Sequence, residues 1–204
     1  GAFSGRLEYK HMDTSDSISL EETLEALGEL VKQGKVRQIG LSNETPWGTM
    51  KYLELAESKS LPRVASIQNA YNLVNRGFEI GLSEIAMHEQ VGLLAYSPLA
   101  QGTLTGKYLG GQMPQGSRLA LFGDGPLMMR YKGDKTQQAI EMYVNLAKKY
   151  EIDAAQLAIQ FCNIQPFVTS TIIGATTMEQ LKTCIDSVDP VSYTHLTLPT
   201  RRGV

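Results

Sequence analysis

The most informative stretch of the chain is LLAYSPLAQGTLTGK, residues 93–107. An apolar run at residues 91–95 predicts a buried strand, which breaks at residues 96–98 into a loop that contains glycines, hydroxyl side chains and Lys107. In parallel α/β proteins, ligands bind where the carboxyl ends of strands meet the following loops, because backbone N–H groups and small polar side chains converge there. The stretch therefore predicts a strand followed by a ligand-binding loop.

The same succession of strand, polar loop and helix occurs four times along the chain. The predicted strands are residues 36–41, 64–67, 91–95 and 168–173, and the polar residues or glycines that end them are Ser42-Asn43, Gln68-Asn69, Tyr96-Ser97 and Gly174-Ala175-Thr176. Periodicity and capping residues predict helices that start at Ser19, at Thr45, at Asp153 and at Thr176 or Thr177, and others built on residues 80–86 and 135–150. Residues 108–134, rich in glycine, methionine and proline, are expected to form a mobile flap.

Repeated units of this kind imply a parallel sheet, because each helix carries the chain back to the end of the sheet at which the previous strand began. Two arrangements satisfy this, a doubly wound sheet and a (β/α)8 barrel. A doubly wound dinucleotide domain carries G-x-G-x-x-G after its first strand, and a phosphate-loop enzyme carries G-x-x-x-x-G-K-[ST]; the sequence contains neither motif. The polar strand ends instead predict an α/β fold that is half of a (β/α)8 TIM barrel, with its functional rim.

Composition narrows the class of protein. The chain has 204 residues, of which 42% are hydrophobic and 20% charged, and this suits a globular domain with a sizeable core. The net charge of −2 and the lack of a basic block give no reason to expect nucleic acid or a membrane as partner, and no segment is apolar enough to span a bilayer. No signal peptide is recognised, and Cys162 and Cys184 form no CxxC pair, so we expect a cytoplasmic protein.

Four motifs carry a resemblance to a known family: GKVRQIGLSNETPWG, SIQNAYNLVNR, LLAYSPLAQGTLTGKYL and STIIGATTMEQLK. In order and spacing they resemble the second half of an aldo-keto reductase barrel, strands 5 to 8, from about Leu20 to Ser187. Within that family the chain is most similar to the bacterial Tas-type NADP(H)-dependent reductases, and the potassium-channel β subunits are more distant relatives. The resemblance implies a reductase with NADP(H) as cofactor and a small-molecule carbonyl substrate. The alternative function is a nucleotide-binding regulatory module like the channel subunits.

The resemblance also implies which residues bind the nicotinamide. In the family, the Ser-Asn pair after the fifth strand and the Gln of the sixth hydrogen-bond the carboxamide, which assigns that role to Ser42, Asn43 and Gln68. Asn and Gln suit an amide partner because each supplies donors and an acceptor. The aromatic residue that ends the seventh strand stacks on the nicotinamide ring, here Tyr96, for which the alternative is a core aromatic residue.

Two further groups match the family's phosphate-binding segments. The loop that wraps the pyrophosphate corresponds to Ser97, Pro98, Leu99, Ala100, Gln101, Gly102 and Lys107, with Arg118 farther along the flap. The adenosine phosphate site corresponds to Gly174, Thr176 and Gln180, at a helix start where free N–H groups favour an anion, although plain helix capping explains Thr176 equally well. Cys184 stands where the family usually has an Asn that contacts the adenine, so we expect weaker adenine binding.

The family's Asp, Tyr, Lys and His, which transfer the proton, belong to the first half of its barrel. Nothing around Tyr9 or His11 matches those motifs, so the sequence assigns no catalytic residue and the chain is expected to be a fragment. We expect residues 1–18 to be a loop after a missing strand, residues 19–189 the barrel half, and residues 190–204 a non-native, adaptor-derived tail, with a divergent tail as the alternative. Half a barrel exposes unpaired strand edges, so independent folding is doubtful and the oligomeric state is left open.

Other chemistry is not indicated. The three histidines, His11, His88 and His195, have no metal-ligand spacing, so no zinc site is expected. Cys162 lies on an apolar helix face, which predicts a packed thiol and not a nucleophile.

Overall fold

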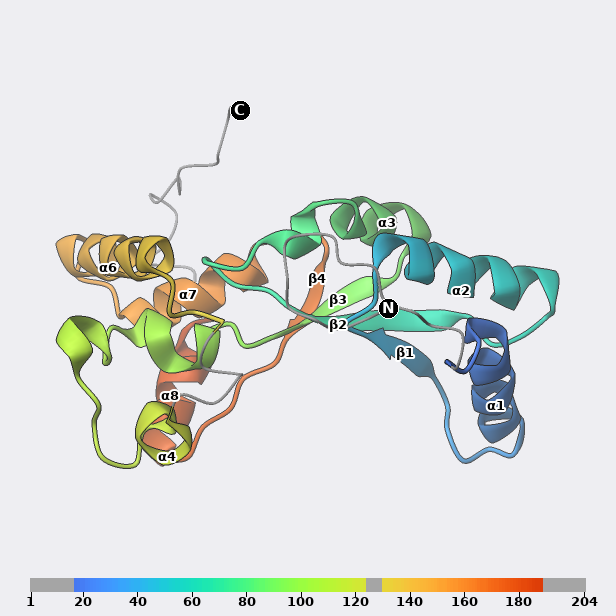
Figure 1. Ribbon diagram of the computed structural model, residues 1–204, viewed down its shortest axis with the longest axis horizontal. Helices are drawn as coiled ribbons and strands as arrows, with labels where there is room; N and C mark the ends of the chain where they lie inside the picture. Colours follow the sequence, from blue (N-terminus) through green and yellow to red (C-terminus); the bar gives the residue numbers. More distant parts are fainter. Residues whose placement is uncertain (1–16, 124–129, 189–204) are drawn as a thin grey trace. The chain divides into compact units, whose positions relative to one another are not determined.

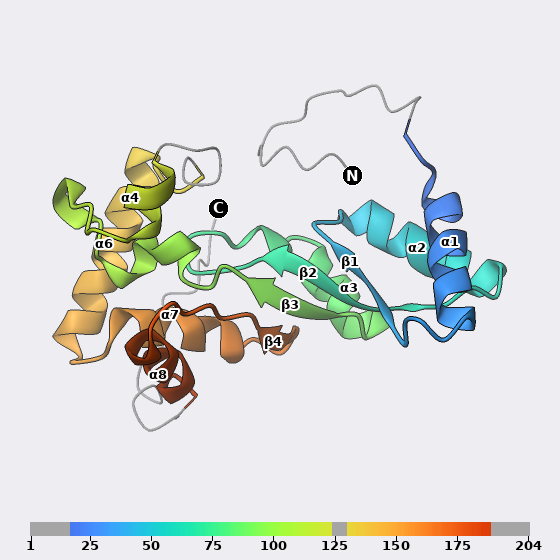
Figure 2. The ribbon, with the colours of Figure 1, turned by 90° about the horizontal axis from the view of Figure 1, so that it is seen from below.

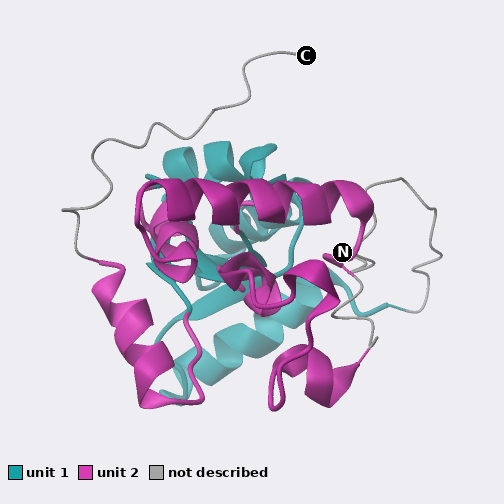
Figure 3. Ribbon diagram, turned by 90° about the vertical axis from the view of Figure 1, so that its left-hand side faces the viewer, with its two compact units in different colours: residues 1–71, 75–96, 165–172 teal, residues 72–74, 97–164, 173–204 magenta. Residues whose placement is uncertain are grey.

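The computed structural model describes residues 17–123 and 130–188. Its contacts divide the chain into two compact units, coloured separately in Figure 3. Unit 1 comprises residues 1–71, 75–96 and 165–172, and unit 2 comprises residues 72–74, 97–164 and 173–204. The sequence expectations for the ends of the chain, including His11, His195 and the tail at 190–204, lie outside the described residues.

Unit 1 contains a four-stranded parallel sheet, drawn as arrows in Figures 1 and 2. Its strands follow the order of the sequence: β1 (Ile39–Ser42), β2 (Val64–Ala70), β3 (Gly92–Tyr96) and β4 (Val168–Thr171). Every neighbouring pair is parallel. A doubly wound sheet reverses its strand order at a switch point, whereas this sheet adds each new strand on the same side, as a (β/α) barrel does.

The two faces of the sheet differ in their side chains. Ile67, Leu93 and Ala95 are at most 1% exposed and form the core on the face that the helices of unit 1 cover. The intervening positions, such as Gln68 on β2 and Tyr96 on β3, are exposed or half-buried. The face that carries Gln68 and Tyr96 therefore holds mostly polar and small side chains, together with Leu94, as expected from the period of two along a strand.

The described part of this unit has three α-helices, α1 (Leu20–Lys32), α2 (Pro46–Ser58) and α3 (Leu82–Glu89), and a 3-10 helix, η1 (Gly77–Glu79). The predicted caps are confirmed, because Ser19 Oγ accepts from the N–H of Glu22 at 3.1 Å and Thr45 Oγ1 accepts from that of Gly48 at 3.1 Å. A proline occupies the first turn of α2, as predicted. Helices α2 and α3 contact β2 and β3 respectively and lie along one face of the sheet (Figure 1).

Unit 2 is helical. It contains the 3-10 helices η2 (Ala100–Thr105) and η3 (Leu109–Gly111), and the α-helices α4 (Arg118–Phe122), α6 (Asp134–Lys149), α7 (Ala154–Asn163) and α8 (Met178–Asp186). Helices α6, α7 and η2 contact one another, and α8 packs on α7. Asp153 caps α7 as predicted, accepting from the N–H groups of Ala155 at 2.8 Å and Gln156 at 3.0 Å. The predicted flap is not wholly irregular, since it holds η3 and α4; residues 124–129 of it lie outside the described part.

Several predicted boundaries are wrong. Strand β2 continues past the predicted end at Ile67, because its ladder with β3 runs on to Ala70. Strand β1 begins at Ile39, where its pairing with β2 starts, and not at residue 36. Ile80, predicted on the packed face of α3, lies before that helix and is 80% exposed, since Gly81 with φ of 84° interrupts the helical backbone.

Within the described residues, no helix is both long and apolar enough to cross a membrane.

Candidate functional site

The carboxyl ends of β1 and β2 bring together the three residues expected to bind the carboxamide. Ser42 and Gln68 are register partners across the two strands. Asn43 follows Ser42 directly, and its backbone N–H donates to the carbonyl of Gln68 at 2.9 Å. The three side chains therefore share one edge of the sheet, where carboxyl ends of parallel strands open toward a ligand.

Tyr96 ends β3 at the same edge, opposite Ala70 of β2. Its hydroxyl donates to Oδ1 of Asn43 at 2.8 Å, which joins the ends of two strands that are not neighbours in the sheet. The Tyr96 side chain is half-buried and not part of the core. An aromatic face at the sheet edge, next to amide groups, is able to stack on a planar ring whose substituent needs hydrogen bonds.

Left-handed backbone conformations recur at the predicted site residues. Asn43 has φ of 54°, Ser97 of 55°, Ala100 of 47° and Gln101 of 61°. Residues other than glycine adopt this region at a cost, and such positions concentrate at ligand-binding turns. Four of the seven non-glycine residues with positive φ in the described chain belong to the predicted set.

In unit 2, the turn at Gly102 makes room for Lys107. Gly102 has φ of 94°, and a Cβ built there would lie 3.0 Å from both Cε and Nζ of Lys107. The Lys107 ammonium also lies 5.2 Å from the centre of the Tyr108 ring. Lys107 is therefore held over its own loop, unlike a lysine that extends into solvent, and it gives the loop a fixed positive charge that suits a phosphate.

The same loop buries a polar atom without a partner. Oε1 of Gln101 has no hydrogen-bond partner among the described residues. A buried acceptor of this kind is costly to leave unpaired, so a ligand hydroxyl or ordered water that donates to it would be favoured. A cationic side chain and an unpaired acceptor in one loop fit the phosphate and sugar groups of a dinucleotide.

The remaining predicted residues of unit 2 are exposed on its surface, apart from the buried ones described below. Arg118 is exposed at the start of α4. Gly174, Thr176 and Gln180 are exposed around the start of α8, where Gln180 Oε1 accepts from the backbone N–H of Thr176 at 2.9 Å and Thr177 caps the helix. The N-cap is therefore Thr177 and not Thr176, whose backbone N–H and hydroxyl instead donate to the Gln180 side chain.

Cys184 is only 5% exposed. Burial, followed by the nearby Asp153 carboxylate, raises the pKa of its thiol. A side chain this enclosed offers a ligand little surface.

Pro98, Leu99 and Ala100 complete the predicted loop, and Pro98 and Ala100 are buried within unit 2.

Sequence reasoning assigned no role to two amide side chains, Asn72 of unit 2 and Asn69 of unit 1. Asn72 is fully buried, and its Nδ2 donates to the carbonyl of Ser97 at 2.9 Å and to the hydroxyl of Tyr131 at 3.1 Å. Oδ1 of Asn69 is buried without a partner among the described residues. The pair Gln68-Asn69 was expected only to end a strand. No short-range pattern in the sequence indicates the bond from Asn72 to Tyr131, which spans 59 residues.

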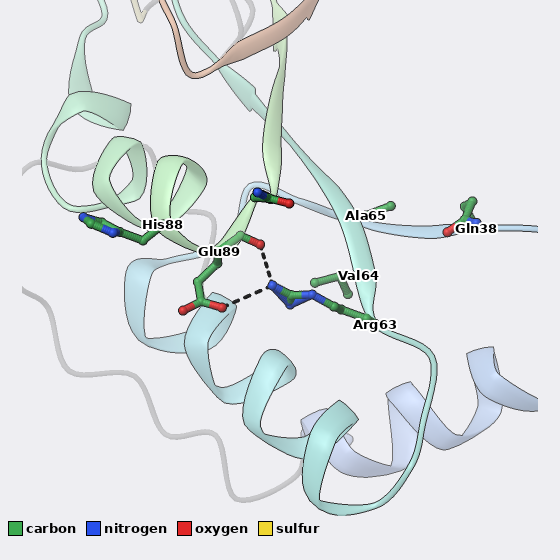
Figure 4. A pocket seen from close by; sticks show the side chains of 7 residues that line it. Gln38, Arg63, Val64, Ala65, His88 and Glu89 are labelled. Atoms are coloured by element: carbon green, nitrogen blue, oxygen red, sulfur yellow. Dashed lines mark hydrogen bonds and ion pairs between the residues drawn. The ribbon is translucent and has the colours of Figure 1, made fainter.

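A hollow of about 440 Å³ lies elsewhere in unit 1, at the amino ends of the strands (Figure 4). Its lining includes Gln38, His88 and an ion pair in which a guanidinium nitrogen of Arg63 meets Oε2 of Glu89 at 3.1 Å. This is the edge opposite the predicted site. In barrel-like folds the amino edge serves stability and the carboxyl edge carries ligand chemistry.

No cluster of metal-ligating side chains occurs in residues 17–123 and 130–188. Cys162 is 0% exposed, and burial raises the pKa of its thiol to about 12. The prediction of a packed thiol is therefore confirmed.

The four-stranded parallel sheet, with polar residues at its carboxyl edge, belongs to a parallel α/β protein and is consistent with part of a (β/α) barrel. Comparison with known sequences makes this specific: the model of the Aldo/keto reductase family matches residues 7–194, and the chain belongs to that family. The family is one of oxidoreductases.

Individual relatives agree with this assignment. Over 184 residues the chain is 51% identical to Protein tas of Escherichia coli, a match that covers 90% of this chain and 52% of that protein. It is 32% identical over 188 residues to L-glyceraldehyde 3-phosphate reductase of E. coli (91% and 54% covered), and 31% identical over 179 residues to a probable voltage-gated potassium channel subunit beta of Arabidopsis thaliana (86% and 54% covered). The predicted likeness to Tas-type proteins is confirmed, and the chain spans about half the length of these relatives.

Proposed function

We propose that the chain is part of an NADP(H)-dependent aldo-keto reductase that reduces aldehydes or ketones to alcohols, built as the second half of a (β/α)8 barrel. The observation that carries the proposal is the set of four side chains at one sheet edge, Ser42, Asn43, Gln68 and Tyr96, joined by the hydrogen bond between Tyr96 and Asn43. Membership of the family supports a nicotinamide cofactor. Two cysteines that are buried and not joined in a disulfide suit a cytoplasmic enzyme.

The residues of unit 1 would hold the nicotinamide end. Ser42, Asn43 and Gln68 offer the donors and acceptors that a carboxamide needs, and Tyr96 offers a ring face. When bound, the nicotinamide supplies the hydride that reduces the carbonyl carbon. The protein's contribution here is orientation, since a ring stacked on Tyr96 and fixed by its carboxamide exposes only one face to a substrate.

The residues of unit 2 would hold the phosphates. Lys107 supplies a cationic group fixed over Gly102, and Gln101 supplies a buried acceptor. We propose the start of α8 as the adenosine phosphate site, because its N-terminal N–H groups and positive dipole end favour an anion.

No residue of this chain is assigned as the proton donor for the reaction. It matches about half the length of the relatives, and we propose that the Asp, Tyr, Lys and His that transfer the proton belong to the other half. Purified alone, the chain would then bind NADPH without reducing a carbonyl compound. Aldehyde-dependent oxidation of NADPH by the chain alone would contradict this division of roles.

The binding proposal is tested by titrating NADPH while following its fluorescence. Tyr96→Ala should weaken binding about tenfold by removing the stacking surface, and Gln68→Ala about three- to tenfold by removing a hydrogen bond. Gln38→Ala, at the opposite edge of the same sheet, is the matched control and should leave the dissociation constant unchanged. Unchanged affinity in both site variants, or no binding by the wild-type chain, would refute the proposal.

A second candidate is a nucleotide-binding regulatory module, which the 31% identity to a probable potassium channel subunit beta favours. Both candidates bind the dinucleotide, so binding does not separate them. The residues of the other half do: a protein in which a Tyr and a Lys complete the site should turn over aldehydes, whereas a sensor should bind NADPH with little turnover.

A further inference from the structure

The first part of the proposed pyrophosphate loop, residues 97–102, has an unusual backbone. Left-handed φ angles of 55°, 47°, 61° and 94° occur at Ser97, Ala100, Gln101 and Gly102. Three of these residues are not glycine, so the loop holds a conformation that costs free energy. Such a conformation persists only where the surrounding structure holds it in place. The loop therefore needs a support outside its own sequence.

The side chain of Asn72 supplies such a support and is fully buried. Its Nδ2 donates to the carbonyl of Ser97 at 2.9 Å and to the hydroxyl of Tyr131 at 3.1 Å, while its Oδ1 accepts from the N–H of Val74 at 3.0 Å. The amide cannot be turned end for end, because the Ser97 carbonyl has no proton to donate. The same carbonyl accepts from the N–H of Ala100 at 2.9 Å, so Asn72 bonds to the atom that closes the first turn of the loop.

Tyr131 connects this support to a helix. Its side chain is 1% exposed, and its backbone carbonyl accepts from Nε2 of Gln137, on α6, at 2.6 Å. The Tyr131 hydroxyl takes one N–H of the Asn72 amide and the Ser97 carbonyl takes the other. A series of hydrogen bonds within unit 2 thus runs from α6 through Tyr131 and Asn72 to the loop.

We propose that Asn72 is a positioning residue, oriented by the Tyr131 hydroxyl, that holds residues 97–102 in their binding conformation before the dinucleotide arrives. The inference rests on the proposed function and gives a role in it to a fully buried side chain. A loop that is fixed in advance spares the complex the free energy of ordering it, and the gain appears as affinity. Without Asn72, the dinucleotide has to order the loop itself and binds more weakly.

A double-mutant cycle on the full chain tests this series of bonds, with NADPH affinity measured by isothermal titration calorimetry. Asn72→Ala should weaken binding about five- to tenfold, and Tyr131→Phe, which keeps the ring, about threefold. In the Asn72→Ala background, Tyr131→Phe should change affinity less than about 1.5-fold, because the hydroxyl acts through Asn72. Tyr52→Phe removes a different buried tyrosine hydroxyl, on α2, and is the control that should leave affinity unchanged.

Two readouts separate positioning from a general loss of stability. The compound 2′-phospho-ADP-ribose contains the pyrophosphate but no nicotinamide, so Tyr131→Phe should weaken its binding by the same factor as that of NADPH. A merely structural role would weaken neither ligand at a temperature at which the variant is fully folded. In the ligand-free chain, hydrogen exchange at the N–H groups of Ala100 and Gly102, which bond within the loop, should be about threefold faster in Tyr131→Phe.

The outcomes distinguish this inference from the proposed function. Additive effects of the two substitutions, unchanged exchange in the loop, or a loss of affinity for NADPH but not for 2′-phospho-ADP-ribose would overturn the inference and leave the proposed function standing. If Asn72→Ala does not fold, Tyr131→Phe alone decides, and wild-type affinity for both ligands in that variant would overturn the inference. Failure of the wild-type chain to bind NADPH would overturn both.

Discussion

The buried Cys162 thiol should control part of the stability of the protein at alkaline pH. Burial raises its pKa from the ordinary 9.0 to about 12, so the folded state favours the protonated thiol. Its stabilising contribution is complete below pH 9 and declines as the pH rises toward 12, by up to about 1.4 kcal/mol per pH unit. Denaturant unfolding across this range should show the decline in the wild type and a shallower one in Cys162→Ala.

Alkylation provides the complementary check on Cys162. The thiol should react with iodoacetamide at pH 8 only after unfolding, because it is fully enclosed on α7 and its Sγ lies 3.6 Å from the carbonyl of Ala158. Rapid labelling of Cys162 in the folded chain would show that the site opens.

Gly102 is predicted to matter through Lys107. Alanine at this position would strain a backbone with φ of 94° and bring its Cβ within 3.0 Å of the Lys107 ammonium, so we expect both a loss of about 1 kcal/mol of stability and weaker NADPH binding. Gly110→Ala is the matched control, since it has φ of 68° but open space around its Cβ. It should lose comparable stability and keep its NADPH affinity; equal affinity losses in both variants would contradict a specific role for Lys107.

Helix α2 depends on its cap. Thr45 accepts from Gly48 N–H and precedes Pro46, so Thr45→Ala leaves an N-terminal donor without its side-chain partner. We expect a loss of about 1 kcal/mol in the free energy of unfolding, measured by urea titration, and near-complete recovery in Thr45→Ser. A Thr45→Ser variant as unstable as Thr45→Ala would mean that the methyl group, and not the hydroxyl, is what stabilises the helix.

The helices could be predicted from sequence more accurately than the strands, for a physical reason. Caps such as Ser19, Thr45 and Asp153 act within one turn, so the chain itself contains the information. A strand ends where its partner stops pairing, and β2 therefore reaches Ala70 although its apolar run ends at Ile67. Gln68 and Asn69, expected to follow the strand, lie within β2 near its carboxyl end, ahead of Ala70.

The organisation of the site itself was only partly predictable. The residues at the strand ends follow from the motifs, but the bond from Tyr96 to Asn43 spans 53 positions and that from Asn72 to Tyr131 spans 59. Such bonds depend on sheet register and on where left-handed turns aim side chains, which no local pattern encodes. The backbone of Gln101 and the placement of Lys107 over Gly102 are of the same kind.

We propose that the carboxyl edge of the parallel sheet, and not the hollow at its amino edge, binds the nicotinamide. A crystal structure of the chain grown with NADP⁺ decides between the two edges. We expect the nicotinamide ring against Tyr96, with its carboxamide at Asn43 and Gln68. A dinucleotide bound instead in the hollow beside Arg63 and His88, or a nicotinamide with no contact to Tyr96, would contradict it.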